Sequence, residues 1–312
     1  MRDKLLSLLI MMTLISTITT VFVLVGLSWT KFPSIYFPII IGIFLSSMVI
    51  YVLFTIKTFA QNYSPFKVSI VGQPNSGKTV YLTVLFETIQ YYKNSNVNFF
   101  PYGRETIEQI SSDLSILHNG KWLKPTSKES LFFYRANAVI GSGLFSKKYT
   151  VEIADYAGEY VNEFDSSSES WLHKTDYFKH VVSSDAILFA VDGIILKSGN
   201  KTKINEIQNK LIAAFQVMVD EKGVSADRKL RSPVALLILK SDIFDNIVID
   251  ERKILGYLKR LIIICETKCY NFKTYFVSSV GKTKLDGSPP EEIKPYNVCE
   301  PMIWLLKQGK SK

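Results

Sequence analysis

One stretch of the chain has the residue types and spacing of a phosphate-binding loop. Residues 72–79 read Gly-Gln-Pro-Asn-Ser-Gly-Lys-Thr, which matches the pattern G-x-x-x-x-G-K-[ST]. Glycines let such a loop curl, so that backbone N–H groups face a phosphate at the N-terminus of a helix. Lys78 is expected to reach the terminal phosphate oxygens, and the Thr79 hydroxyl to bind Mg²⁺. The predicted nucleotide-binding residues of this loop are Gly72, Gln73, Pro74, Asn75, Ser76, Gly77, Lys78 and Thr79.

A second group of residues could serve the metal and the terminal phosphate. Asp155 follows a predicted strand, which places its carboxylate beside the loop, where it can hold Mg²⁺ through water. Gly158 can bring a backbone N–H close to the γ-phosphate, and Glu159 can orient an attacking water. Thr126 is the candidate that completes the Mg²⁺ shell when the γ-phosphate is present. The predicted metal ligands are Thr79, Thr126 and Asp155, and the catalytic candidates are Lys78, Glu159 and Thr126.

A third group could read the base. Lys240 and Asp242 follow an apolar run at residues 234–239. A carboxylate at Asp242 can accept hydrogen bonds from guanine N1 and N2 while the Lys240 stem lies over the ring. Adenine offers no matching pair of donors. Ser278 and Ser279 follow the last predicted strand, where backbone groups can contact the guanine O6.

The elements around these groups alternate between strands and helices. Short apolar runs at 66–71, 186–191, 234–239 and 274–277 predict buried strands, and residues 78–92 predict a helix. Segments 131–140 and 148–154 flank Gly141-Ser-Gly143 and predict a hairpin. The fold class is therefore α/β, with a mostly parallel sheet, helices on both faces and one antiparallel edge pair. An insertion at 94–120, with a helix at 104–118, is expected to cap one side of the nucleotide or to bind a partner.

The first 60 residues differ from the rest. Residues 5–28 and 34–56 contain no charged side chain, and about 24 helical residues cross a hydrocarbon core of about 30 Å. We predict a two-helix transmembrane hairpin in residues 1–60, followed by a nucleotide-binding domain in residues 61–312. Counting Lys and Arg beside the spans places both termini and that domain in the cytoplasm, as a multi-pass integral membrane protein. A cleaved signal peptide is the alternative for the first span; its length and the immediate second span argue against it.

Charge and cysteine content narrow the class further. The chain has 312 residues and a net charge of +9. It contains only 3 Cys, which excludes a disulfide scaffold. No basic helix or aromatic-basic motif favours nucleic acid as a partner. The positive charge instead suits anionic lipid headgroups beside the predicted anchor.

The order of these motifs resembles the Ras-like and translation-factor-related class of small GTPases, from about residue 66 to Trp304. More narrowly, residues 122–126, 155–159 and 298–306 resemble the bacterial double-GTPase-like families, and the membrane tether is similar to that of the signal recognition particle receptor β subunit. The resemblance implies a P-loop NTPase G domain that binds GTP and Mg²⁺, with nucleotide state controlling a protein effector or regulator. Segments 121–130 and 155–175, the latter with Phe164 and Trp171, are the expected partner surfaces.

Two residues depart from the GTPase pattern. Leu239 stands where the class usually has Asn or Thr, which removes a polar tie between the base-reading strand and the phosphate loop. Glu159 replaces the usual Gln, so hydrolysis to GDP and phosphate is expected to be slow without a partner. The sequence thus predicts a membrane-anchored, nucleotide-dependent switch. Two alternatives stay open: a non-hydrolysing pseudo-GTPase that serves as a membrane docking subunit, and an ATP-dependent P-loop enzyme.

Overall fold

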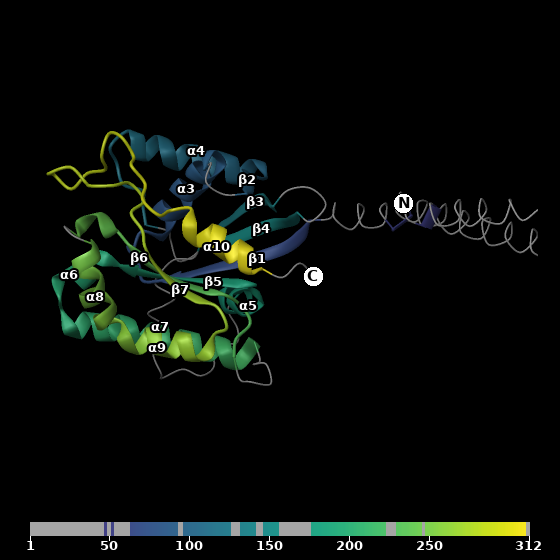
Figure 1. Ribbon diagram of the computed structural model, residues 1–312. Helices are drawn as coiled ribbons and strands as arrows, with labels where there is room; N and C mark the ends of the chain where they lie inside the picture. Colours follow the sequence, from purple (N-terminus) through teal and green to yellow (C-terminus); the bar gives the residue numbers. More distant parts are fainter. Residues whose placement is uncertain are drawn as a thin grey trace, which may run out of the picture. The chain divides into compact units, whose positions relative to one another are not determined.

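The computed structural model describes residues 47–48, 51–52, 63–92, 96–125, 132–141, 146–155, 176–222, 229–244 and 247–309. The chain divides into two compact units, Met1–Gln61 and Asn62–Lys312. All helices and strands labelled in Figure 1 belong to the second unit. The predicted membrane hairpin lies outside the described residues, apart from four positions. Among the residues that are described, none of the helices has the length and apolar character needed to span a bilayer.

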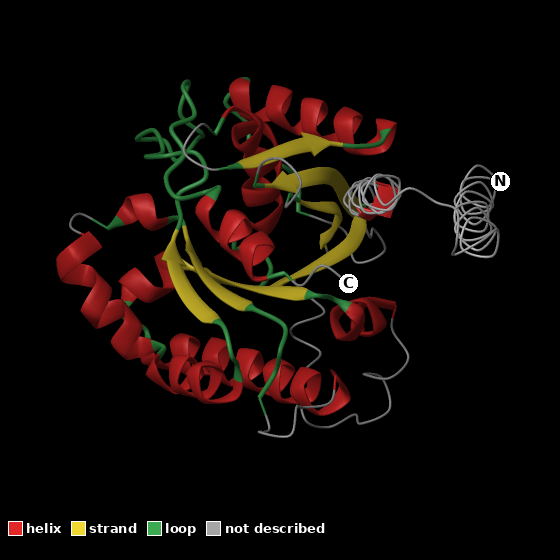
Figure 2. Cartoon of the chain, turned by 45° about the vertical axis from the view of Figure 1, so that its right-hand side comes forward, coloured by secondary structure: helices red, strands yellow, loops and turns green. Residues whose placement is uncertain are grey.

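A twisted sheet forms the centre of the second unit (Figure 2). It has seven strands, in the order β2-β3-β4-β1-β5-β6-β7. The strands are β1 (Ser64–Gly72), β2 (Val97–Pro101), β3 (Phe132–Ile140), β4 (Lys147–Asp155), β5 (Ala186–Asp192), β6 (Val234–Leu239) and β7 (Phe272–Phe276). Strands β4, β1, β5, β6 and β7 are parallel neighbours. Strand β3 runs antiparallel to both β4 and β2. The carboxyl ends of the parallel strands therefore share one edge of the sheet, as a nucleotide fold requires.

Helices cover both faces of the sheet. They are α3 (Lys78–Thr88), α4 (Arg104–His118), α5 (Asp176–Ser183), α6 (Gly193–Ser198), α7 (Lys201–Lys222), α8 (Ile247–Tyr257), α9 (Lys259–Lys268) and α10 (Glu300–Gln308), with short 3-10 turns η1 (Ile89–Tyr91) and η4 (Ser241–Ile243). One face packs against α3, α4 and α10, and the other against α5 to α9. The predicted α/β fold with helices on both faces is confirmed.

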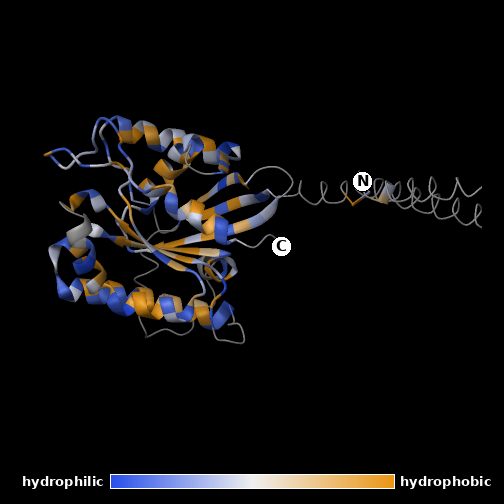
Figure 3. Cartoon of the chain, in the orientation of Figure 1, coloured by the Kyte–Doolittle hydropathy of each residue, from blue (hydrophilic) through white to orange (hydrophobic). Residues whose placement is uncertain are grey.

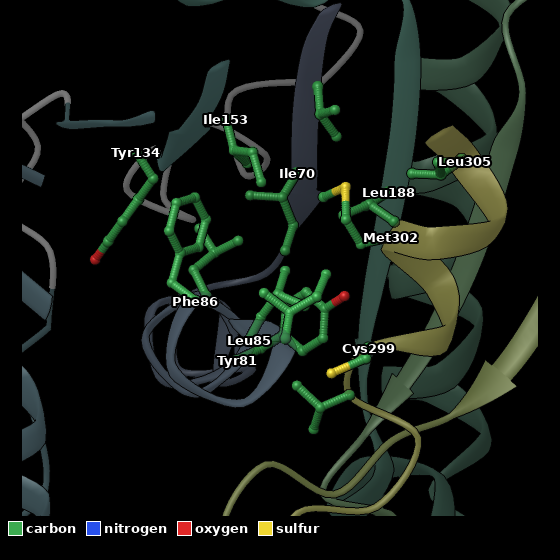
Figure 4. Packing of buried hydrophobic residues seen from close by; sticks show 14 of the residues in the cluster. Ile70, Tyr81, Leu85, Phe86, Tyr134, Ile153, Leu188, Cys299, Met302 and Leu305 are labelled. Atoms are coloured by element: carbon green, nitrogen blue, oxygen red, sulfur yellow. The ribbon is translucent and has the colours of Figure 1, made fainter. Parts of the chain in front are cut away.

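Two hydrophobic clusters hold these layers together. On one face Ile70 and Leu188 of the sheet meet Leu85 of α3 and Met302 of α10 (Figure 4). On the other face, the second cluster includes residues of β5, α7 and α9. Both faces of β5 and β6 are covered, so consecutive residues are buried and apolar, from Ala186 to Val191 in β5 and throughout β6 (Figure 3).

The antiparallel side of the sheet differs from the prediction. Residues 97–101, which lie in the predicted insertion, form β2 and pair with β3, so the sheet has two antiparallel pairs instead of one. Val97 and Phe99 are buried while Asn98 is exposed, which is the alternation of an edge strand with one covered face. Phe99 packs edge-on against Phe86 of α3, with ring centroids 5.2 Å apart. Burial of these two side chains makes the segment a strand.

The rest of the insertion packs onto the phosphate-loop helix. The helix expected at 104–118 is present as α4, with the same bounds. Asp113 of α4 is buried and accepts a hydrogen bond from Thr83 of α3 at 3.2 Å. Gln109 donates to the other oxygen of the same carboxylate at 2.9 Å. Through Thr83, this buried carboxylate ties α4 to α3; whether the insertion also caps the nucleotide or binds a partner stays a prediction.

Candidate functional site

The loop between β1 and α3 has backbone positions that favour glycine or asparagine. A Cβ added at Gly72 would lie 2.4 Å from the carbonyl oxygen of Ala190, so β1 and β5 can approach there only through a glycine. Asn75 and Gly77 have φ values of 60° and 94°, in the left-handed region. The N–H of Tyr81 then donates to the Gly77 carbonyl at 2.9 Å, which starts α3. Residues 72–79 thus form the curled strand-to-helix turn that the sequence predicted.

Lys78 lies inside the curl of this loop. Its side chain is 7% exposed, and Nζ donates to the carbonyls of Gly72 at 2.9 Å and Gln73 at 2.8 Å. Burial lowers the pKa of Lys78 from 10.5 to about 8, and the Asp155 carboxylate offsets part of that effect. The loop therefore holds an ammonium group whose charge has little water around it, which favours contact with an anion.

Thr79, in the first turn of α3, contacts Asp155, the last residue of β4. The Thr79 hydroxyl donates to a carboxylate oxygen of Asp155 at 2.7 Å, and Asp155 is 2% exposed. The contact arises because β4 pairs with β1, so the end of β4 lies beside the phosphate loop. A hydroxyl and a carboxylate are the oxygen ligands that Mg²⁺ prefers. These two residues fit the predicted metal site.

Lys240 connects the loop after β6, which contains the predicted base-reading residue Asp242, to the phosphate loop. Its backbone has a φ of 57°, and Nζ donates to the Asn75 carbonyl at 2.8 Å and to a carboxylate oxygen of Asp192 at 2.7 Å. The apolar Leu239 predicted that no polar contact would join this strand to the phosphate loop. Leu239 is indeed buried in the first core cluster. The tie exists, and the side chain of Lys240 supplies it.

Sequence reasoning missed Asp192. It ends β5, the parallel neighbour of β1, and its second carboxylate oxygen accepts from the Ile194 N–H at 2.8 Å as the N-cap of α6. Its position after the apolar run 186–191 was the available signal, because carboxyl ends of neighbouring parallel strands converge on the same edge.

The two segments predicted to read the base, around Asp242 and Ser278, lie side by side. The Ser278 hydroxyl donates to a carboxylate oxygen of Asp242 at 2.7 Å, and the Ser241 N–H donates to the Val277 carbonyl at 3.0 Å. The Gly281 N–H donates in turn to the Ser278 hydroxyl at 3.1 Å. Ser278 and Ser279 are both buried. The Asp242 carboxylate is thereby fixed in orientation, with a second oxygen that can accept further hydrogen bonds.

Part of the predicted site lies outside the described residues. Thr126, Gly158 and Glu159 belong to this part, as does most of the predicted partner segment 155–175, including Phe164 and Trp171. The chain leading to Thr126 is described as far as Pro125. In it the Trp122 ring N–H donates to the Gly287 carbonyl at 2.8 Å, which joins this segment to the loop before α10.

Comparison with known families gives one match. The family model described as "50S ribosome-binding GTPase" matches residues 67–225. The matched region runs from β1 past α7, so it contains the phosphate loop, Asp155 and Asp192 but ends before Lys240. A comparison with curated proteins found no match.

Several solved structures are similar at low sequence identity. The Arl6 small GTPase of Trypanosoma brucei with a bound nucleotide analogue is 12% identical over 78% of this chain and 96% of its own, with a TM-score of 0.41. The signal recognition particle receptor SRb-GTP/SRX complex of Chaetomium thermophilum is 12% identical over 72% and 96%, with a TM-score of 0.40. A GTP-binding protein of Sulfolobus solfataricus in complex with GDP is 14% identical over 84% of this chain and 56% of its own, with a TM-score of 0.36.

Proposed function

This chain belongs to the family of 50S ribosome-binding GTPases, and on that premise we propose that it is a membrane-anchored, nucleotide-dependent switch. The family match confirms the resemblance to the GTPase class and the presence of a GTP-binding domain. The proposal adds that GTP and GDP states control a partner protein. It also adds that GTP is hydrolysed with Mg²⁺, slowly in the absence of that partner.

The observation that carries the proposal is the position of Lys240. Its ammonium contacts the phosphate loop at Asn75, and its backbone leads into Asp242 two residues later. One side chain therefore joins the place where phosphates bind to the place where a base is read. Such a link supports one nucleotide site rather than an isolated anion-binding turn.

The residues of the candidate site have separate roles in this proposal. Backbone N–H groups of the phosphate loop and the Lys78 ammonium bind the phosphates. The Asp242 carboxylate accepts from guanine N1 and N2, and backbone groups at Ser278 and Ser279 contact O6. Thr79 and Asp155 would hold Mg²⁺ together with Thr126, and bound Mg²⁺ neutralises charge on the phosphate oxygens.

Two predicted roles concern the terminal phosphate. The Gly158 N–H is proposed to contact it, and Glu159 to orient the attacking water. A Glu carboxylate beside a phosphate anion is less favourable than the usual Gln amide, because like charges repel. Slow intrinsic turnover is therefore the expected behaviour. Segments 121–130 and 155–175 are proposed to carry the partner surface.

The membrane part of the proposal rests on composition. Residues 5–28 and 34–56 have no charged side chain, and each is long enough to cross a bilayer as a helix. Lys and Arg at the outer ends of the pair favour both termini and the nucleotide-binding domain in the cytoplasm. Alkaline carbonate extraction of the full chain tests this point. An integral protein stays in the pellet, and release into the supernatant would contradict the anchor.

Nucleotide content tests the function. Both hydrophobic clusters lie between Phe66 and Leu306, so a fragment of residues 62–312 contains the whole described core. This fragment and its Lys78→Ala variant are purified without added nucleotide, denatured and analysed by chromatography. We expect GDP or GTP from the parent and a reduced amount from the variant, whose unfolding temperature checks that it is folded.

The same preparation separates the alternatives. Phosphate release from added GTP supports the switch, whereas bound GTP that is never hydrolysed favours the docking subunit. Binding of ATP with no guanine nucleotide would establish the ATP-dependent alternative.

A further inference from the structure

The nucleotide residues occupy one edge of the sheet, and the opposite edge has a different character. Strands β1, β5, β6 and β7 all begin at this opposite edge, since they are parallel. Helix α10 ends there as well. The Tyr149 hydroxyl and Lys147 Nζ, both near the start of β4, donate to the Gly309 carbonyl at 2.9 Å and 3.1 Å. Several elements far apart in sequence therefore meet at this edge.

Basic side chains gather at this edge from separate elements. We call the following set the basic edge: Lys147 and Lys148 of β4, Lys179 of α5, Arg231 before β6, Lys268 at the end of α9, Lys273 of β7 and Lys307 near the end of α10. All seven are exposed or half-buried. The acidic side chains described nearby are Asp220, Glu221 and Glu266, which are exposed, and Asp185, which is half-buried. The basic edge thus has an excess of positive charge.

Two tyrosines stand beside these cations. Tyr63 is 43% exposed and comes directly before β1, and Tyr270 is 50% exposed and follows α9 by two residues. A tyrosine ring has an apolar body and a polar tip, so it suits the boundary between water and lipid. Lys and Arg stems behave in the same way and keep their charges in the headgroup region.

We propose that the basic edge docks onto the anionic phospholipid headgroups of the membrane. This inference rests on the anchored switch proposed above, because the chain enters β1 at Ser64 directly from the segment that contains both uncharged stretches. A domain tied to a bilayer at that point is held near its surface, where lysines and arginines bind anionic lipid. The nucleotide site, at the opposite edge of the sheet, then faces the cytoplasm.

A nucleic acid is the other anionic macromolecule that a basic surface could bind. The observations favour lipid, because the two tyrosines and the point of chain entry lie at the same edge as the cations. The seven basic residues also come from six different places in the fold, without the basic recognition helix that nucleic-acid binding commonly uses.

Sedimentation with vesicles tests the proposal. The fragment of residues 62–312 is mixed with vesicles of phosphatidylcholine alone, or of phosphatidylcholine with phosphatidylserine. We expect binding only to the mixed vesicles and loss of binding at high salt. The test variant is Lys148→Gln/Lys268→Gln/Lys307→Gln. Each charge near an anionic surface contributes about fivefold in affinity, so the triple variant should bind about a hundredfold more weakly.

A matched control removes the same charge elsewhere. Lys201, Lys203 and Lys259 are exposed at the N-terminal ends of α7 and α9, near the nucleotide edge. Lys201→Gln/Lys203→Gln/Lys259→Gln should keep the vesicle affinity of the parent within about twofold if docking is local to the basic edge. An equal loss in both triple variants would overturn the proposal, because it would show attraction by net charge alone.

Two further results of the vesicle experiment would also test the proposal. Failure of the parent fragment to bind mixed vesicles, or tighter binding to single-stranded RNA than to these vesicles, would overturn the lipid proposal. The fragment lacks the predicted hairpin, so its result is independent of carbonate extraction of the full chain. GTP binding by each variant shows that the nucleotide site is intact. Failure of the basic edge, of the anchor and of the switch can therefore be told apart.

Discussion

Lys240 and Asp192 form an ion pair of 2.7 Å between the ends of β6 and β5, and the same ammonium donates to the Asn75 carbonyl of the phosphate loop at 2.8 Å. The Lys240 side chain is 33% exposed and that of Asp192 12%. Three neighbouring strands of the sheet, β1, β5 and β6, are thereby joined at their carboxyl ends by one cation. This arrangement links the phosphate loop to the loop that contains Asp242.

Removal of this cation should weaken nucleotide binding. In Lys240→Ala the Asn75 carbonyl and the Asp192 carboxylate lose a charged donor, and hydrogen bonds to charged groups are worth about 1.5–3 kcal/mol each. We expect the affinity for a fluorescent GTP analogue to fall by about tenfold to a hundredfold. Lys203→Ala, at an exposed position of α7, is the control and should bind as the parent does. Equal affinity of Lys240→Ala and the parent would contradict the structural role assigned to Lys240.

The buried ammonium of Lys78 predicts a pH dependence. Its pKa is lowered to about 8 by burial, whereas a Lys in the unfolded chain has a pKa near 10.5. Phosphates bind the protonated form, so affinity for GDP should decrease as pH rises through 8, by up to about tenfold at pH 9. Fluorescence titrations between pH 7 and 9 measure this. The Lys78→Ala variant should bind weakly and show a flatter profile, since the titrating group is gone.

Lys78 should also make the stability of the domain depend on pH, but in the opposite direction to nucleotide affinity. Between pH 8 and 10.5 the unfolded chain binds more protons at this lysine than the folded domain does. The free energy of unfolding of the nucleotide-free domain should therefore rise with pH in this window because of Lys78. Urea denaturation of the parent and Lys78→Ala isolates the contribution. A parent-minus-variant difference that falls with pH would contradict the lowered pKa.

The contact between Thr79 and Asp155 predicts how Mg²⁺ affects binding. For the parent, removing Mg²⁺ with a chelator should weaken GTP binding by about tenfold or more, because a metal-bridged phosphate loses its counter-charge. Thr79→Ala should bind GTP weakly with or without Mg²⁺, and Thr79→Ser, which keeps the hydroxyl, should behave as the parent. The account of this metal site fails if Thr79→Ala responds to the chelator as strongly as Thr79→Ser does.

Two buried tyrosines should respond differently to loss of their hydroxyl groups. The Tyr81 hydroxyl lies in the core beside Cys299 and has no hydrogen-bond partner among the described residues (Figure 4). The Tyr149 hydroxyl donates to the Gly309 carbonyl at 2.9 Å. Tyr149→Phe should lower the free energy of unfolding by about 1 kcal/mol, and Tyr81→Phe should leave it unchanged or raise it by a similar amount. Urea denaturation of both variants gives the comparison; a larger loss in Tyr81→Phe would be inconsistent with the packing.

The sequence predicted most of the sheet and the phosphate loop because local patterns determine them. The run at 234–239 coincides with β6, and the helix at 104–118 coincides with α4. Residues 78–92 became α3 and η1, and the hairpin strands became β3 and β4 with shifts of one residue. Apolar runs and helical periodicity are local properties, so they can be read without the tertiary structure.

The sequence could not predict features that depend on tertiary contacts. Strand β2 is short and ends in Pro101, and it depends on pairing with β3 and on the packing of Val97 and Phe99 in the core cluster. The roles of Lys240 and Asp192 depend on the order of β5 and β6 beside β1 and on the left-handed backbone at Lys240. Lys240 and Asp192 are 48 residues apart, so no local sequence pattern could predict their contact.

The central claim is that Asp242 reads guanine in a site continuous with the phosphate loop. The most direct measurement is the affinity of the parent fragment and of Asp242→Asn for GTP, ATP and xanthosine triphosphate. A carboxylate accepts from guanine N1 and N2, whereas an amide can donate to the O2 that xanthine has in place of the guanine amino group. We predict that the parent prefers GTP and that Asp242→Asn loses GTP affinity and gains affinity for xanthosine triphosphate. ATP binding equal to that of GTP in the parent, or a variant that still prefers GTP, would contradict the claim.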